Sequence, residues 1–214
     1  MPAAAHDLPR HFPVFPLRGS VLLPYGRLPL HVFEPRYRVL VRDVLAGEGM
    51  FGMIQPRPGH EGDPRPPLYV TGCLGRVAAH RPLPDGRFLV VLAGICRFDL
   101  VEELEVETPY RQVEAAFDRW LADLAPVEDA PHLAGRLLPL VDRYLDLLGA
   151  EVDRTALRRM PFPVLVAMLT TVLPLDPEEK QAVLEARDLA AQAAVLEGLL
   201  EIGLAGDTSR ERPH

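Results

Sequence analysis

The chain has 214 residues, of which 48% are hydrophobic and 25% are charged, and its formal net charge at pH 7 is −7. These proportions are those of an average globular protein, so they exclude a wholly disordered chain, and the length predicts one or two domains. The negative charge argues against a protein that binds nucleic acids or anionic membranes through a general basic field.

The N-terminal residues, 1–11, lack the basic and apolar regions of a secretory signal, so we expect a cytoplasmic protein. The longest uncharged run, 160–175, contains three prolines and is shorter than the roughly 20 apolar residues that a membrane span requires. We interpret this run as a core helix and expect no membrane partner.

Catalytic and metal-binding motifs are difficult to assemble from this sequence. Cys73 and Cys96 are the only cysteines, and without a CxxC or a nearby histidine pair they predict two reduced, buried thiols. The only lysine, Lys180, lies outside any phosphate-binding loop, and the two serines, Ser20 and Ser209, lie outside any nucleophile elbow. We therefore expect no catalytic residue, metal or cofactor, and a protein that is not an enzyme.

The first half of the chain, up to Pro131, carries 17 of the 23 prolines between short apolar segments, a pattern typical of strands and turns. A helix is predicted over 35–45, where Pro35 suits the first turn. The most secure element is a hairpin whose turn is Leu83–Arg87 and which brings Cys96 close to residues 73–75. The strands predicted along this half lie within 12–17, 21–23, 28–33, 50–55, 68–79, 88–101 and 110–117.

After Pro131 the apolar residues recur every three or four positions, which predicts a helical bundle. The clearest helix start is Asp176–Glu179, where an N-cap aspartate precedes a proline and two acidic residues. A further apolar series with helical spacing runs from Ala182 to Leu200. The bundle carries most of the negative charge, since residues 119–214 hold 10 basic and 16 acidic side chains.

A series of motifs resembles the substrate-recognition domain found at the N-terminus of ATP-dependent Lon proteases. It begins with Phe12–Leu17, Leu23–Pro24 and Leu28–Leu30, and continues with Phe33–Tyr37 at a helix start. Further matches follow in order at Phe51–Gly52, Gly72–Gly75, Asp85–Arg87, Gly94, Arg97–Phe98, Leu173–Leu175 and Lys180–Glu185. The ordered series covers about residues 11–203 and is more specific than any one of its motifs.

This resemblance implies an α+β fold, with a PUA-like β-barrel followed by an all-α helical bundle. We expect the barrel, with one helix, at 12–118 and the bundle at 132–205. A linker is expected at 119–131, and flexible termini at 1–11 and 206–214.

The resemblance also implies a free-standing, non-catalytic module that recognises unfolded or extended polypeptide, because the ATPase and protease modules of Lon do not follow in this sequence. A separate ATPase or protease is then an expected partner. One alternative is an RNA-associated PUA-like module, although the net charge makes nucleic acid a less favoured partner. Arg36, Arg38 and Arg42 on one helix would form its basic patch. A less favoured alternative is an uncharacterised hydrolase that uses carboxylates in the barrel mouth.

Four residues are predicted to bind peptide at the barrel rim, namely Arg36, Tyr37, Arg97 and Phe98. A guanidinium or a phenol near such a rim can form hydrogen bonds with an extended peptide. The alternative interpretation of Arg36 is an internal ion pair.

Overall fold

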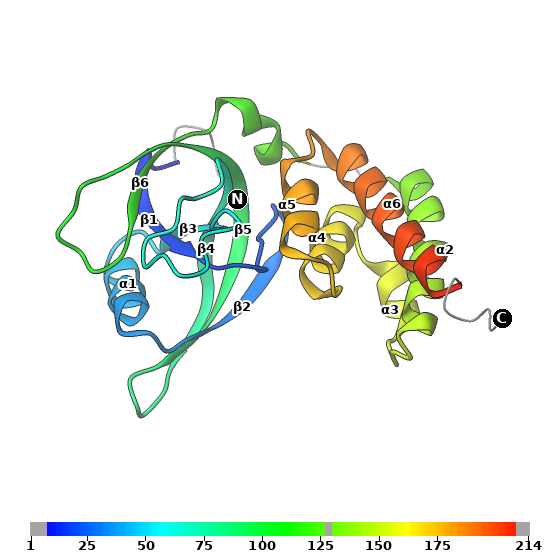
Figure 1. Cartoon of the computed structure of the whole chain (residues 1–214), viewed down its shortest axis with the longest axis horizontal. Coiled ribbons are helices and arrows are strands. Elements are labelled where there is room, and N and C mark those ends of the chain that lie inside the picture. The colour runs from blue at the N-terminus through cyan, green and yellow to red at the C-terminus, as the bar shows by residue number, and fades with distance from the viewer. Residues whose placement is uncertain (1–7, 127–129, 209–214) are drawn as a thin grey trace.

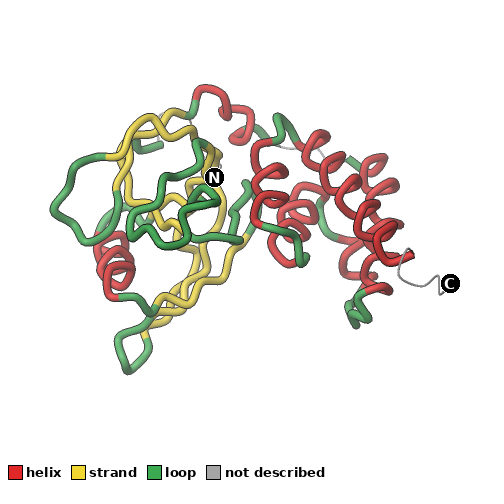
Figure 2. The backbone as a smooth tube through the Cα atoms, in the orientation of Figure 1, coloured by secondary structure: helices red, strands yellow, loops and turns green. Residues whose placement is uncertain are grey.

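The computed structural model describes residues 8–126 and 130–208, in which a β-rich half is followed by a helical half (Figure 1, Figure 2). This order confirms the predicted α+β fold. The elements are β1 (His11–Pro16), β2 (Arg27–Val32), α1 (Pro35–Ala46), β3 (Met50–Ile54), β4 (Thr71–Pro82), β5 (Phe88–Glu103), β6 (Gln112–Ala116), the 3₁₀ helix η2 (Asp118–Leu124), α2 (Pro131–Leu147), α3 (Arg154–Arg159), α4 (Phe162–Val172), α5 (Pro177–Glu185) and α6 (Leu189–Thr208).

The six strands form one sheet in the order β2-β5-β4-β3-β1-β6, which closes because β6 also pairs with β5. The paired strands are antiparallel except β1 and β3, which run parallel. Closure leaves β2 outside the ring of five strands, where it pairs with β5 alone. β2 therefore keeps an unpaired edge along its whole length.

The β4–β5 hairpin has the predicted turn, in which Gly86 adopts a φ of +80° that favours glycine. Leu74 lies opposite Cys96, as the predicted pairing requires, while Cys73 lies opposite Arg97. Because neighbouring residues of a strand point to opposite faces, the two free, buried thiols lie on opposite sides of the sheet.

The predicted strand at 21–23 is wrong. These residues are buried, but they belong to a loop that turns where the Gly26 amide donates to the carbonyl of Leu23 at 3.0 Å. Gly75 and Gly94 of the β4–β5 pair make room for this loop, since a side-chain carbon on either would collide with Leu22 or Leu23. Tertiary packing, rather than strand pairing, explains the apolar run.

Two apolar clusters stabilise the β-rich half. One fills the barrel around Phe12, Phe98 and Trp120, where the Phe12 and Phe98 rings meet edge to face at 5.0 Å between centroids. The other lies under α1, where Tyr37 stacks on Phe15 with centroids 3.9 Å apart. This second cluster continues into the helical half, so the two halves share one apolar core.

In the helical half α2 packs along α6, while α4 and α5 lie between these helices and the barrel (Figure 1). The run at 160–175 is the buried helix α4, as predicted. The predicted helix start is present as well, because Asp176 and Glu179 form a capping box at α5. Among the described residues, no helix is both long and apolar enough to span a membrane.

The apolar series from Ala182 to Leu200 is divided between α5 and α6 by a break at residues 186–188. Part of the expected linker at 119–131 is ordered, because Asp118–Leu124 forms η2 against β5. The ranges 1–7, 127–129 and 209–214, which include most of the expected flexible termini, lie outside the described residues.

Candidate functional site

Arg36 and Tyr37, the first pair of predicted site residues, begin α1 on the far side of the barrel from the helices (Figure 1). Arg36 is exposed and pairs with Glu34 at 2.9 Å, while its guanidinium lies 4.5 Å from the Tyr37 ring centroid. The Tyr37 ring is buried against Phe15, and this burial raises the pKa of its phenol. Arg36 is therefore the member of this pair that a ligand can reach.

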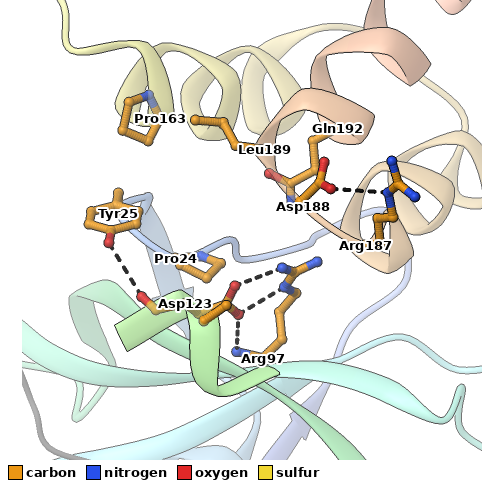
Figure 3. Close-up of a pocket in the computed structure, with 10 residues that line it drawn as sticks. Pro24, Tyr25, Arg97, Asp123, Pro163, Arg187, Asp188, Leu189 and Gln192 are labelled. Carbon is orange, nitrogen blue, oxygen red and sulfur yellow. Dashed lines mark hydrogen bonds and ion pairs between the residues drawn. The ribbon is translucent and has the colours of Figure 1, made fainter. Parts of the chain in front are cut away.

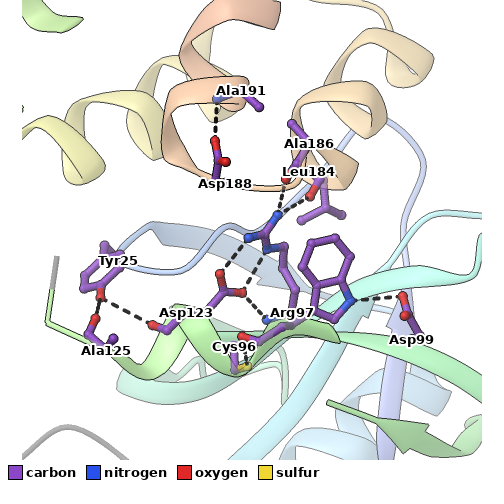
Figure 4. Close-up of polar contacts among 11 residues, drawn as sticks. Tyr25, Cys96, Arg97, Asp99, Asp123, Ala125, Leu184, Ala186, Asp188 and Ala191 are labelled. Atoms are coloured by element: carbon purple, nitrogen blue, oxygen red, sulfur yellow. Dashed lines mark hydrogen bonds and ion pairs between the residues drawn. The ribbon is translucent and has the colours of Figure 1, made fainter. Parts of the chain in front are cut away.

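Arg97 is buried at the junction between the halves (Figure 4). Its Nε and one terminal nitrogen donate to the carboxylate of Asp123 at 2.8 and 2.6 Å, and its backbone amide donates to the same carboxylate at 3.0 Å. The other terminal nitrogen donates to the carbonyls of Leu184 and Ala186 at the end of α5. Its guanidinium carbon lies 4.0 Å from the ring centroid of Trp120. Arg97 thus joins β5, η2 and α5.

Phe98, the neighbour of Arg97, points into the barrel and has no exposed surface. Its ring packs between Phe12 and Phe117, so it cannot contact a peptide unless the barrel opens. The structure does not bring the four predicted residues together, because α1 and the junction lie at opposite ends of the barrel (Figure 1). Their role in peptide binding stays a prediction.

The arginines of α1 do not form the single basic patch that an RNA-binding surface would need. A helix advances about 100° per residue, which places Arg38 and Arg42 on one side of α1 and Arg36 away from them. The Arg38 guanidinium packs against Gly86 at the hairpin turn, and Arg36 is neutralised by Glu34.

A small cavity of about 120 Å³ lies at the junction (Figure 3). Its floor is the Arg97–Asp123 ion pair, and its rim includes Arg187 and Asp188, which pair at 3.0 Å. Tyr25 forms one wall with a φ of +64°, a conformation that costs a non-glycine residue about 1–3 kcal/mol. Its phenol donates to the carbonyl of Ala125 at 2.7 Å, which holds the strained loop against η2. The cavity has room for about four water molecules, and its charged groups already have partners.

A second set of buried polar contacts joins the halves beside α5. The Gln55 amide nitrogen donates to the carbonyl of Pro177 at 2.8 Å and to the Gln181 side chain at 3.2 Å. Gln181 in turn donates to the carbonyl of Thr71 at 3.1 Å. These bonds and the Arg97 contacts fix the helical half relative to the barrel.

An apolar groove lies instead on the outer face of β2, β5 and β4, and we call it the outer groove. It has a volume of about 470 Å³ and is lined by Pro29, Leu30, His31, Ala79, His80, Arg81, Leu89, Val90 and Val91. Two rows of paired residues cross it, Pro29–Val91–Ala79 and His31–Leu89–Arg81. Phe33 follows β2 at one end, is 59% exposed, and lies 6.0 Å from the His31 ring.

Our sequence reasoning did not identify the outer groove. Its signal in the sequence is the alternation of β2, where Leu28, Leu30 and Val32 are buried and the residues between them are exposed. A large apolar residue left exposed directly after such a strand marks a candidate interaction surface.

Neither thiol is suited to nucleophilic chemistry. Burial raises the pKa of Cys73, and burial with the nearby Asp123 carboxylate raises the pKa of Cys96 to about 12. Both side chains therefore stay protonated at neutral pH. Within 8–126 and 130–208, no three His, Cys, Asp or Glu side chains are arranged to hold a metal ion.

Comparison of the sequence with models of protein families gives a match. The model of the ATP-dependent protease La (LON) substrate-binding domain matches residues 11–201. The chain belongs to this family. The match is to the substrate-binding domain of Lon and not to its protease domain.

Relatives of the Lon substrate-binding family include the Lon protease of Anaeromyxobacter dehalogenans, which is 31% identical over 201 residues, and Lon protease 2 of Myxococcus xanthus, which is 30% identical over 197. Each alignment covers 91% of this chain but only 23% and 24% of the respective relative. The chain thus spans about a quarter of the length of these curated Lon proteases.

Solved structures of Lon N-terminal domains share the fold. A Lon N-terminal domain protein from Xanthomonas campestris has a TM-score of 0.59 and 27% identity, covering 89% of this chain and 97% of that one. The N-terminal domain of Mycobacterium avium complex Lon protease has a TM-score of 0.66 and 16% identity, covering 89% and 98%. These likenesses confirm a barrel followed by helices as the architecture of this chain.

Proposed function

We propose that this chain is a non-catalytic module that binds unfolded or extended polypeptide segments, and that the outer groove is the surface that binds them. The observation that carries the proposal is the exposed Phe33 ring beside a groove walled by Leu89 and Val91. Membership of the Lon substrate-binding family supports a role in recognition. A separate ATPase or protease would act on the polypeptide that the module holds.

The strength of binding follows from the apolar surface available. Covering one exposed aromatic side chain contributes about 1.5–3 kcal/mol, and an interface of a few such side chains reaches micromolar affinity after the cost of ordering a flexible segment. We therefore expect dissociation constants in the micromolar range.

The test uses a reduced, carboxymethylated protein that cannot fold, labelled for fluorescence anisotropy. Phe33→Asp and Leu89→Asp should weaken its binding at least about tenfold. Ile202→Asp is the matched control, because Ile202 is 69% exposed on α6, away from the groove. Equal binding by all these variants and the unaltered chain would refute the groove as the site. Absence of binding by the unaltered chain would refute the function.

A further inference from the structure

The edge of β2 next to the outer groove has free backbone groups. The amide of Gly94 donates to the carbonyl of Gly26 at 2.9 Å, which shows that Gly26 faces β5. Because alternate residues of a strand direct their backbone groups to opposite sides, Arg27, Pro29 and His31 direct theirs away from β5. No described residue forms a hydrogen bond with these groups.

Pro29 and α4 limit what this edge can accept. Pro29 has no amide hydrogen, so the edge offers two donors, the amides of Arg27 and His31, and the three carbonyls. At its start β2 meets the helical half, since a side-chain carbon on Gly26 would lie 3.1 Å from Ala167 of α4. The accessible edge therefore runs from Arg27 towards Phe33, a length of about six residues or 20 Å.

The surface beside this edge is basic as well as apolar. Arg81 lines the outer groove, and Arg27 is exposed on the same face of β2 as Pro29 and His31. Neither arginine forms an ion pair with any residue in the described part of the chain. The nearby acidic residues Glu34 and Asp85 are each paired with another arginine. The groove therefore presents uncompensated positive charge on a chain whose net charge is −7.

We propose that the groove binds an extended segment that adds to β2 as a further strand and whose apolar side chains are flanked by acidic ones. This inference rests on the proposed function and names its substrate class. Strand addition satisfies the free backbone groups of β2 and places every second side chain of the segment on the same face as Pro29 and His31, at the margin of the outer groove. An acidic residue at one end of the segment then lies near Arg27, while Arg81, two strands from β2, adds to the positive potential of the same face.

One experiment tests the charge preference. Two labelled seven-residue peptides share a central sequence of alternating aromatic and small residues, and differ in carrying Glu or Lys at both ends. The acidic peptide should bind at least about fivefold more tightly at low salt, and the combined Arg27→Glu and Arg81→Glu change should reverse that order. Arg143→Glu is the matched control, since Arg143 is exposed on α2. Equal binding of both peptides, or an equal response to Arg143→Glu, would overturn the proposed substrate class.

A second experiment tests strand addition. Hydrogen exchange by NMR should show the amides of Arg27 and His31 protected in the complex with the acidic peptide. N-methylation of alternate peptide residues should weaken binding about tenfold in one register and little in the other. If neither effect appears while Phe33→Asp still weakens binding of the unfolded protein, strand addition is wrong and the proposed function stands. Concentration-dependent dimerisation of the chain alone that Arg27→Glu abolishes would instead assign the edge to a second copy.

Discussion

Replacement of Asp123 by alanine should destabilise the whole chain strongly. Asp123 and Arg97 are 8% and 4% exposed, so the change leaves a guanidinium buried without its counter-ion. Breaking a buried pair in this way costs about 3–5 kcal/mol, because the remaining charge has lost its compensation for desolvation. In a chain of this size the loss corresponds to a decrease in melting temperature of about 6–20 °C.

The assay follows urea unfolding by two signals. Trp120 is the only tryptophan and lies against Arg97, so its emission reports on the junction, while circular dichroism reports on the helices. Arg187→Ala is the control, because it removes an exposed ion pair at the rim of the same cavity and should cost less than about 1 kcal/mol. The combined Arg97→Met and Asp123→Leu change should cost less than Asp123→Ala alone. A loss below about 1 kcal/mol for Asp123→Ala would refute this account of the junction.

Three further results are expected. Gly94→Ala should lower the free energy of unfolding by about 3 kcal/mol in urea titration, because its methyl carbon would lie 2.0 Å from the Leu23 carbonyl oxygen. Cys73 and Cys96 should resist a thiol reagent at pH 8 in the folded chain and react with it in urea. The contribution of Cys96 and Tyr110 to stability should be complete up to about pH 9 and be lost towards pH 12, because burial raises the pKa of both groups to about 12 from ordinary values of 9.0 and 10.0.

Each of these three predictions would be refuted by a specific result. Unchanged stability of Gly94→Ala would show that the loop at Leu23 can move aside. Rapid labelling of the folded chain would show that the thiols are accessible. For the alkaline transition, both groups are protonated in the folded state, so their contribution is complete at low pH and is lost as pH rises through the folded pKa. A urea midpoint that stays constant up to pH 11 would contradict the predicted loss of stability at alkaline pH.

Elements with local signals could be predicted from the sequence. Pro35 starts α1, the Asp85–Gly86 turn closes the long hairpin, and Asp176 caps α5, all within a few residues of the element that each one defines. Such signals need no knowledge of the rest of the chain.

Features that depend on distant partners could not be predicted. The break between α5 and α6 contains no glycine or proline, and it occurs where Arg97, 87 and 89 residues earlier, binds the carbonyls of Leu184 and Ala186. Arg97 was predicted to bind peptide, and its place at the junction could not be predicted because Asp123 and Trp120 come beside it only in the fold. The outer groove was missed for the same reason, since it exists only when β2 pairs with β5.

The position of β1 in the sheet has a consequence for the order in which the chain assembles. His11 pairs with Glu114, 103 residues later, so the ring of strands cannot close during synthesis until β6 has left the ribosome. Until then, the apolar side chains of Phe12 and Val14 lie on a strand whose second edge has no partner. Contacts of such long separation form slowly, whereas the helices form from neighbours in sequence. The barrel is therefore complete only when β6, its last strand, pairs with β1, its first. Before β6 is synthesised, a nascent chain of this protein passes through an aggregation-prone stage.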